Sequence, residues 1–136
     1  MATEAPSTPR KPTHELDWLT DKIIGCAIQV HRTLGPGFLE ATYENALCVE
    51  LQAADLTIEC QVPYPVLYRG TKVGEYRLDL IVEDLAVVEL KSVERFDEVF
   101  KAQLLAYMKV TGKRVGLLFN FNVPVLMDGG FKRLVL

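Results

Sequence analysis

Cysteine is scarce in this sequence of 136 residues, and the three that occur, Cys26, Cys48 and Cys60, are widely spaced. Because their number is odd and no C-x-x-C pair is present, they predict neither a disulfide scaffold nor a zinc cluster. We expect reduced thiols that pack as small buried hydrophobes, as in a cytoplasmic protein.

Long apolar runs and a strong net charge are also missing. No stretch approaches the roughly 18 residues that span a membrane, and residues 1–12 contain no apolar signal core. We therefore expect a cytoplasmic protein with no membrane partner. The 15 basic and 18 acidic residues give a net charge of −3, which argues against a uniformly basic surface that coats DNA.

The hydrophobic residues that are present, 49% of the total, are enough for a folded core. The length suits one domain of ordinary size. Residues 1–13 carry Pro6, Pro9 and Pro12 and are predicted to form a flexible tail. Residues 14–136 are predicted to form the single domain.

Hydrophobic periodicity predicts three helices and at least four strands. Spacings of three and four predict helices over 16–34, 39–54 and 97–110, and Gly35-Pro36-Gly37 ends the first. Strand patterns cover 58–62, 73–82, 85–91 and 114–121, with shorter candidates at 123–127 and 131–136. Pro63 and Pro65 make the first strand an edge or irregular strand. This order predicts an α/β fold, a mixed central sheet flanked by helices, in which 114–121 lies parallel to 85–91.

The strands at 73–82 and 85–91 are close enough in sequence to form a hairpin. If it turns around Asp84, residues whose numbers sum to 168 face each other across the two strands. This register places Asp79 opposite Glu89 and Arg77 opposite Lys91. Opposed Cβ atoms lie only about 5 Å apart, so the two carboxylates repel unless a cation or a proton lies between them.

Two interpretations of these four residues are open. A salt-bridge ladder on a solvated sheet face is common and contributes little stability. However, Glu89 and Lys91 follow an apolar run that is typical of a central strand. In the following helix, Gln103 and Tyr107 lie four residues apart on one face, from which the amide could reach the carboxylates.

Together these residues form the ordered pattern D-x(9)-E-x-K-x(11)-Q-x(3)-Y, from Asp79 to Tyr107. The pattern resembles the active-site signature of the PD-(D/E)xK nuclease superfamily, including the Q-x-x-x-Y helix of its exonuclease-like branch. The resemblance implies a restriction-endonuclease-like core with helix, three strands, helix and strand in the order predicted above. Leu78 departs from the signature, because it stands where the superfamily name has proline.

A second motif precedes this pattern. Gly37, Glu40 and Tyr43 form G-x-x-E-x-x-Y, and the segments at 30–37 and 116–121 accompany it. From about Leu19 to Leu136, the chain resembles the bacterial GxxExxY protein family, whose members have the PD-(D/E)xK fold.

These resemblances imply a metal-dependent nuclease that hydrolyses phosphodiester bonds, of DNA in preference to RNA. They imply that Asp79 and Glu89 hold Mg²⁺, or alternatively Mn²⁺, because hard cations prefer oxygen ligands. The carbonyl of Leu90 could supply a further ligand, and Glu40 would bind the metal directly or through water. The metal would orient and acidify a water molecule.

The remaining signature residues are given roles by the same resemblance. Lys91 would position the attacking water or stabilise charge at phosphorus, and Gln103 and Tyr107 would orient the site or contact nucleic acid. Beside them, His31, Tyr43 and Arg77 are accessory candidates. The turn at 35–37 would bring His31 near Glu40, and Tyr43 would either bond to a site carboxylate or pack. Glu44, on an adjacent row of its helix, is expected to be solvated.

Two other functions are open from the sequence. The first is a catalytically silent member of the fold that binds nucleic acid or a protein partner. The second is a metal-free structural dimer in which the carboxylates pair with Arg77 and Lys91. Because 136 residues leave little surface for substrate recognition, a homodimer or a protein partner could supply specificity.

Overall fold

The computed structural model describes residues 16–136, so the tail predicted for residues 1–13 lies outside the described residues. It contains three helices, α1 (Asp17–Leu34), α2 (Glu40–Ala53) and α3 (Glu98–Thr111). The five strands are β1 (Ile58–Tyr68), β2 (Thr71–Val82), β3 (Ala86–Lys91), β4 (Val115–Asn120) and β5 (Phe131–Val135). Every helix that the hydrophobic periodicity predicts is present, with ends within a few residues of the expected ones.

The strands form one mixed sheet in the order β1-β2-β3-β4-β5. Strands β3 and β4 are parallel and are connected through α3, whereas the other neighbouring pairs are antiparallel. In the β2–β3 pair, Leu80 lies opposite Val88 and Val82 lies opposite Ala86, which confirms the register predicted from a turn at Asp84. The α/β fold with a mixed sheet is therefore confirmed.

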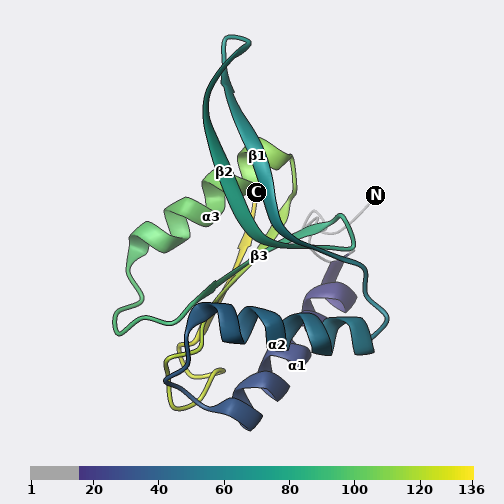
Figure 1. Cartoon of the computed structure of the whole chain (residues 1–136), viewed down its shortest axis with the longest axis vertical. Coiled ribbons are helices and arrows are strands. Elements are labelled where there is room, and N and C mark those ends of the chain that lie inside the picture. Colours follow the sequence, from purple (N-terminus) through teal and green to yellow (C-terminus); the bar gives the residue numbers. More distant parts are fainter. Residues whose placement is uncertain (1–15) are drawn as a thin grey trace, which may run out of the picture.

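Helices cover both faces of the sheet (Figure 1). Helices α1 and α2 pack on one face, in a core that includes Leu80, Val88 and Leu90. Helix α3 packs on the other face against Ile81 and Val87. This split follows from the two-residue period of β-strands, and it places the odd-numbered side chains of β3 on the α3 face.

The turn between α1 and α2 is held in place by Tyr43. Gly35 and Gly37 adopt φ values of 70° and 106°, which glycine adopts without steric cost. The Tyr43 hydroxyl donates to the Gly35 carbonyl and accepts the Phe38 N–H at 3.1 Å, while its ring stacks on Phe121 at 4.5 Å. Tyr43 therefore fixes the path by which the chain enters α2.

Strand β1 is longer than its sequence pattern predicts. It continues through Pro63 and Pro65 to Tyr68, paired only with β2, so it is an edge strand as the prolines predict. Beyond the rest of the sheet, β1 and β2 continue as a twisted two-stranded arm (Figure 1). A strand expected at 123–127 is wrong, because this segment forms bends and turns before β5.

The cysteines differ from their predicted environment. Cys26 and Cys48 are half-buried and Cys60 is exposed, so the expectation of three buried thiols is wrong. Cys60 lies on the edge strand β1, most of whose residues are exposed. No helix among residues 16–136 has the length and apolar character needed to cross a membrane.

Close packing of α3 on the sheet depends on Gly116 in β4. A Cβ atom added there would lie 2.7 Å from the Met108 sulfur and 3.0 Å from a Leu104 methyl carbon. Gly116→Ala should therefore lower the free energy of unfolding by about 1–3 kcal/mol, measured by urea denaturation.

Gly25 of α1 is the matched control, because no atom lies within 4 Å of a Cβ added there. Gly25→Ala should raise the free energy of unfolding by up to about 1 kcal/mol through helix propensity. If the two substitutions changed the free energy of unfolding equally, the close contact of Gly116 with α3 would not contribute to stability.

Candidate active site

Two carboxylates, Asp79 and Glu89, bridge β2 and β3 where the backbone ladder between these strands ends. The Asp79 N–H donates to Glu89 Oε2 at 2.8 Å, and the Leu90 N–H donates to Asp79 Oδ2 at 2.9 Å. Each side chain thus accepts a hydrogen bond from the backbone of the opposite strand. The predicted proximity of Asp79 and Glu89 is confirmed.

The ladder itself stops one residue earlier, at Leu80 and Val88. Beyond this pair, β2 remains paired with β1, and β3 remains paired with β4. The bridging carboxylates replace backbone partners and let the two strands separate. The expected opposition of Arg77 and Lys91 is therefore wrong.

Glu89 is only 3% exposed, although it is charged at neutral pH in an unfolded chain. Burial and the negative charge of Asp79 raise the pKa of Glu89 to about 8, with Lys91 opposing this shift. No ion pair within residues 16–136 involves either carboxylate. These observations contradict the solvated salt-bridge ladder and, within one chain, the pairing of the carboxylates with Arg77 and Lys91 that was expected for the structural dimer.

Lys91 lies at the end of β3 and is oriented by α3. Its Nζ donates to Gln103 Oε1 at 3.2 Å and lies 4.9 Å from the centroid of the Phe100 ring. The predicted approach of the α3 face to the strand is confirmed for Gln103, but the glutamine contacts the lysine and not the carboxylates.

Tyr107 lies one helical turn beyond Gln103 and is buried. Its pKa is raised to about 12 by burial and by the charges of Glu89 and Asp79, which places the phenol near the carboxylate pair. Its ring packs against Tyr76 of the arm, with 5.0 Å between centroids. A phenol with this pKa stays protonated at neutral pH and can act as a hydrogen-bond donor.

Glu40 is the first residue of α2 and is exposed. Its position is set by the preceding turn. Both the Tyr43 hydroxyl and the Ser92 hydroxyl form hydrogen bonds with the backbone of this turn. The Ser92 hydroxyl, next to Lys91 in sequence, donates to the Phe38 carbonyl at 2.7 Å. This bond connects the G-x-x-E-x-x-Y motif to the end of β3. Tyr43 itself packs and bonds to the turn, so of its two expected roles the structure shows packing.

Sequence reasoning missed Glu44 and Gln61. Gln61 Nε2 donates to Glu44 Oε1 at 2.8 Å and lies 3.5 Å from Asp79 Oδ1. Glu44 is half-buried, contrary to the expected solvation, and burial raises its pKa, with smaller contributions from Asp79 and Glu40. The four-residue spacing from Glu40 was the only sequence signal for Glu44.

Gln61 adopts a φ of 51°, in the left-handed region, in the middle of β1. A non-glycine residue in this conformation is strained, and such strain is found preferentially at functional sites. The neighbouring Arg77 donates from Nη1 to the Gln61 carbonyl at 3.1 Å, which supports this backbone bend. Arg77 therefore contacts Gln61, which in turn approaches Asp79, and forms no ion pair with the carboxylates.

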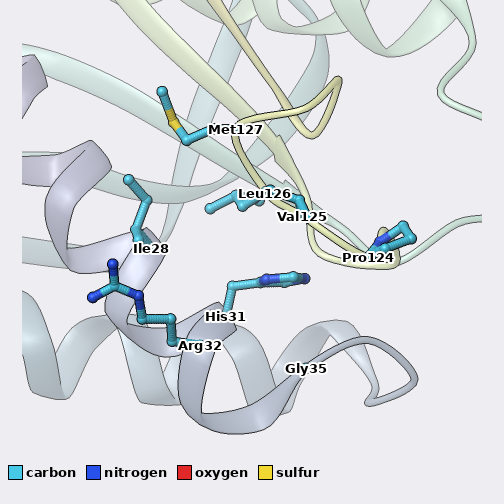
Figure 2. A pocket seen from close by; sticks show the side chains of 8 residues that line it. All are labelled: Ile28, His31, Arg32, Gly35, Pro124, Val125, Leu126 and Met127. Atoms are coloured by element: carbon cyan, nitrogen blue, oxygen red, sulfur yellow. The ribbon is translucent and has the colours of Figure 1, made fainter.

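His31 has a different partner from the one expected. Its Nε2 lies 2.7 Å from the Val123 carbonyl oxygen, so this nitrogen carries the proton that it donates. Figure 2 shows the imidazole directed toward the 123–126 segment, at a cavity of about 470 Å³ that also involves Arg32 and Met127. His31 thus joins α1 to the loop after β4.

The carboxylate pair has the donor chemistry of a divalent metal site. Two carboxylates provide the hard oxygen ligands that Mg²⁺ and Mn²⁺ prefer, and a cation between them would offset their repulsion. Within residues 16–136, however, no three Asp, Glu, His or Cys side chains are close enough together to hold a metal ion. Asp79 and Glu89 therefore fit as a two-carboxylate centre, which Glu40 does not complete in this conformation.

Comparison with known proteins agrees with this geometry. No curated protein and no solved structure matches the chain significantly. The sequence profile of the PD-(D/E)XK nuclease superfamily, in contrast, matches residues 17–134, from the start of α1 into β5. This range includes the carboxylate pair, Lys91 and all three helices, and it covers most of the chain. The chain belongs to the PD-(D/E)XK nuclease superfamily.

Proposed function

We propose that this chain is a Mg²⁺-dependent nuclease that hydrolyses phosphodiester bonds of DNA, with RNA as the second substrate class. Superfamily membership implies nucleic-acid binding, and PD-(D/E)XK nucleases generally use divalent metal ions. The observation that carries the proposal is the pair of half-buried Asp79 and buried Glu89, which has no cationic partner within ion-pair distance among residues 16–136. Folding brings these two acidic side chains together although this raises the pKa of Glu89, and metal binding is the function that explains their retention.

In this proposal Asp79 and Glu89 hold the metal, the Leu90 carbonyl adds a ligand, and Glu40 binds directly or through water. When bound, the metal supplies an acidified water and neutralises charge on the scissile phosphate. The bonds from the Asp79 and Leu90 N–H groups keep one oxygen of each carboxylate fixed. The carboxylates are therefore oriented by the backbone before any ligand arrives, which lowers the cost of ordering the site.

Lys91 supports the reaction through its charge. Gln103 and the Phe100 ring hold its ammonium group beside the carboxylates, where it can stabilise negative charge that develops at phosphorus. The protonated phenol of Tyr107 can donate a hydrogen bond in the same region.

The arm of β1 and β2 provides a surface for the phosphate backbone. From residue 62 to residue 78 it carries three basic residues, Arg69, Lys72 and Arg77, and one acidic residue, Glu75, in a chain whose net charge is −3. Tyr68, at the tip, is 67% exposed. Tyr76 connects the arm to Tyr107 and hence to the site. Basic and aromatic side chains together suit contacts with phosphates and bases.

The motif of Gly37, Glu40 and Tyr43 supports a finer proposal, that the chain is a GxxExxY protein. A catalytically silent module that binds nucleic acid or a protein is the second candidate function. The observation that favours it is that Glu40 is exposed and that no third acidic side chain among residues 16–136 completes a metal site with the carboxylate pair. A homodimer would add surface for substrate recognition in either case.

Metal binding and cleavage test the proposed function directly. Asp79→Asn and Glu89→Gln keep acceptors for the backbone N–H groups but remove the negative charges. Each substitution should abolish binding of Mg²⁺ and Mn²⁺ in calorimetry. Each should also lower cleavage of mixed DNA and RNA substrates by at least about 100-fold, beyond the ~10–100-fold typical of outer-shell residues.

Asp55→Asn is the control, because Asp55 is exposed and lies beyond the opposite end of α2 from Glu40. It should leave binding and cleavage unchanged. Metal binding without cleavage of either substrate would contradict the nuclease. The absence of binding at millimolar metal would contradict the metal-dependent nuclease and leave the silent module.

The raised pKa of Glu89 predicts a pH dependence of stability without metal. An unfolded glutamate loses its proton near pH 4.3, whereas folded Glu89 holds it to about pH 8. Because the folded state binds the extra proton, this contribution is complete below pH 4.3 and declines by roughly 1 kcal/mol per pH unit as pH rises toward 8. Urea unfolding in chelator should show this decline in the wild type.

Glu89→Gln removes the titrating group while retaining the shape and the acceptor. The variant should lack this part of the decline and should be more stable than the wild type at pH 8.5. If the free energy of unfolding changed with pH in the same way for both proteins, the raised pKa of Glu89 would be contradicted.

Binding of DNA should depend on the tip of the arm. The double substitution Arg69→Ala and Lys72→Ala removes two cations, so the affinity for duplex DNA at low salt should fall several-fold. The dependence of log Kd on log salt should become shallower by about 1–2. Lys22→Ala is the control, because Lys22 lies on α1 and bonds to the Ala54 carbonyl. An equal loss of affinity in both variants would show that the arm is not a specific contact.

A further inference from the structure

Two of the three cysteines lie side by side, although they come from different elements. Cys48 belongs to α2 and Cys60 to β1, and their sulfur atoms are 3.2 Å apart. Both are free thiols. A disulfide has an S–S distance of about 2.05 Å, so a displacement of about an ångström would allow a covalent bond.

The two thiols differ in accessibility. Cys60 is exposed, so a small oxidant in solvent can reach its sulfur. Cys48 is half-buried, and burial together with the neighbouring Cys60 raises its pKa to about 12, which keeps it protonated at neutral pH. The first attack on an oxidant therefore falls to Cys60, and Cys48 is placed to react second.

We propose that Cys48 and Cys60 form a reversible disulfide that joins α2 to β1 in response to a peroxide. The Cys60 thiolate attacks one peroxide oxygen, which forms an S–O bond, breaks the O–O bond and releases hydroxide. The Cys48 sulfur then attacks the Cys60 sulfur, which forms the S–S bond and breaks the S–O bond. The Cys48 proton goes to the departing hydroxyl group, which leaves as water, and the proton that Cys60 lost earlier neutralises the hydroxide. In total, two thiols and one hydrogen peroxide give one disulfide and two waters. Exchange with a dithiol reductant restores both thiols.

The position of the pair connects it to the carboxylates. Cys60 directly precedes Gln61, and Cys48 lies one helical turn after Glu44 on α2. Gln61 and Glu44 are the residues that bond to each other and approach Asp79. A disulfide would therefore fix the separation of α2 and β1 beside this contact. Its effect on cleavage rests on the proposed function, whereas its formation does not.

The first experiment measures the number of free thiols and the intact mass of the full chain after hydrogen peroxide treatment. The wild type should lose two of its three titratable thiols and the mass of two hydrogen atoms, without forming dimers. Peptide mapping should find Cys48 joined to Cys60, and dithiothreitol should restore all three thiols. A product with over-oxidised Cys60, with intermolecular links or with a bond to Cys26 would overturn the proposal.

Three single variants complete the test. Cys26→Ser is the matched control, because Cys26 lies on α1 and its thiol approaches the Glu50 carbonyl at 3.7 Å. This variant should form the disulfide as the wild type does. Cys48→Ser and Cys60→Ser should form no intramolecular disulfide, and formation in either one would contradict the assigned pair.

The second experiment asks whether the bond acts on the two elements that it joins. Oxidised wild type and oxidised Cys26→Ser should unfold at a higher urea concentration than their reduced forms, because the crosslink restricts the unfolded chain. Peroxide should not raise this midpoint for Cys60→Ser. If oxidation left the urea midpoint of the wild type unchanged, the proposal that a disulfide joins α2 to β1 would be overturned. If the reduced protein cleaves DNA, the cleavage rate should change several-fold on oxidation and return with dithiothreitol.

Discussion

Two hydrogen bonds between β2 and β3, from the Asp79 N–H to Glu89 and from the Leu90 N–H to Asp79, mark the point on which the arrangement of the site depends. Each carboxylate accepts a backbone N–H from the opposite strand, at a point where two carbonyl groups would continue an ordinary ladder. The bonds orient the two carboxyl groups, and the pairing of β2 with β3 ends beside them. The sheet opens there, so side chains from the helices on both faces approach the same pair of carboxylates. The arm that departs from the sheet begins at the same point.

Two distant parts of the sequence meet around this opening. The turn at 35–38 is held by Tyr43 on one side and by the Ser92 hydroxyl on the other. The position of α2 is therefore coupled to the end of β3, although the sequence of neither segment indicates this contact. Asn120 adds a similar connection, because its side chain bonds to both the N–H and the carbonyl of Val93, each at 3.1 Å. These contacts fix the chain directly after Lys91.

The fold and the centre of the site could be predicted from sequence because they depend on short-range patterns. A tight turn at Asp84 and two apolar strands determine the register, and the register brings Asp79 to Glu89. Gln61 could not be found this way, because its left-handed backbone and its contact with Glu44 depend on the bend of an edge strand over α2. Likewise, the partner of His31 lies 92 residues away in an irregular loop, which no periodicity describes.

The two prolines of β1 have a consequence for association. Pro63 and Pro65 are two residues apart, so their missing N–H groups point to the same side of the strand. Because β1 remains paired with β2 along this stretch, the missing donors belong to the free edge. A further strand added there would find two gaps in its ladder, which disfavours the growth of the sheet into a fibre. The long arm can therefore present its side chains to a partner without offering its backbone for aggregation.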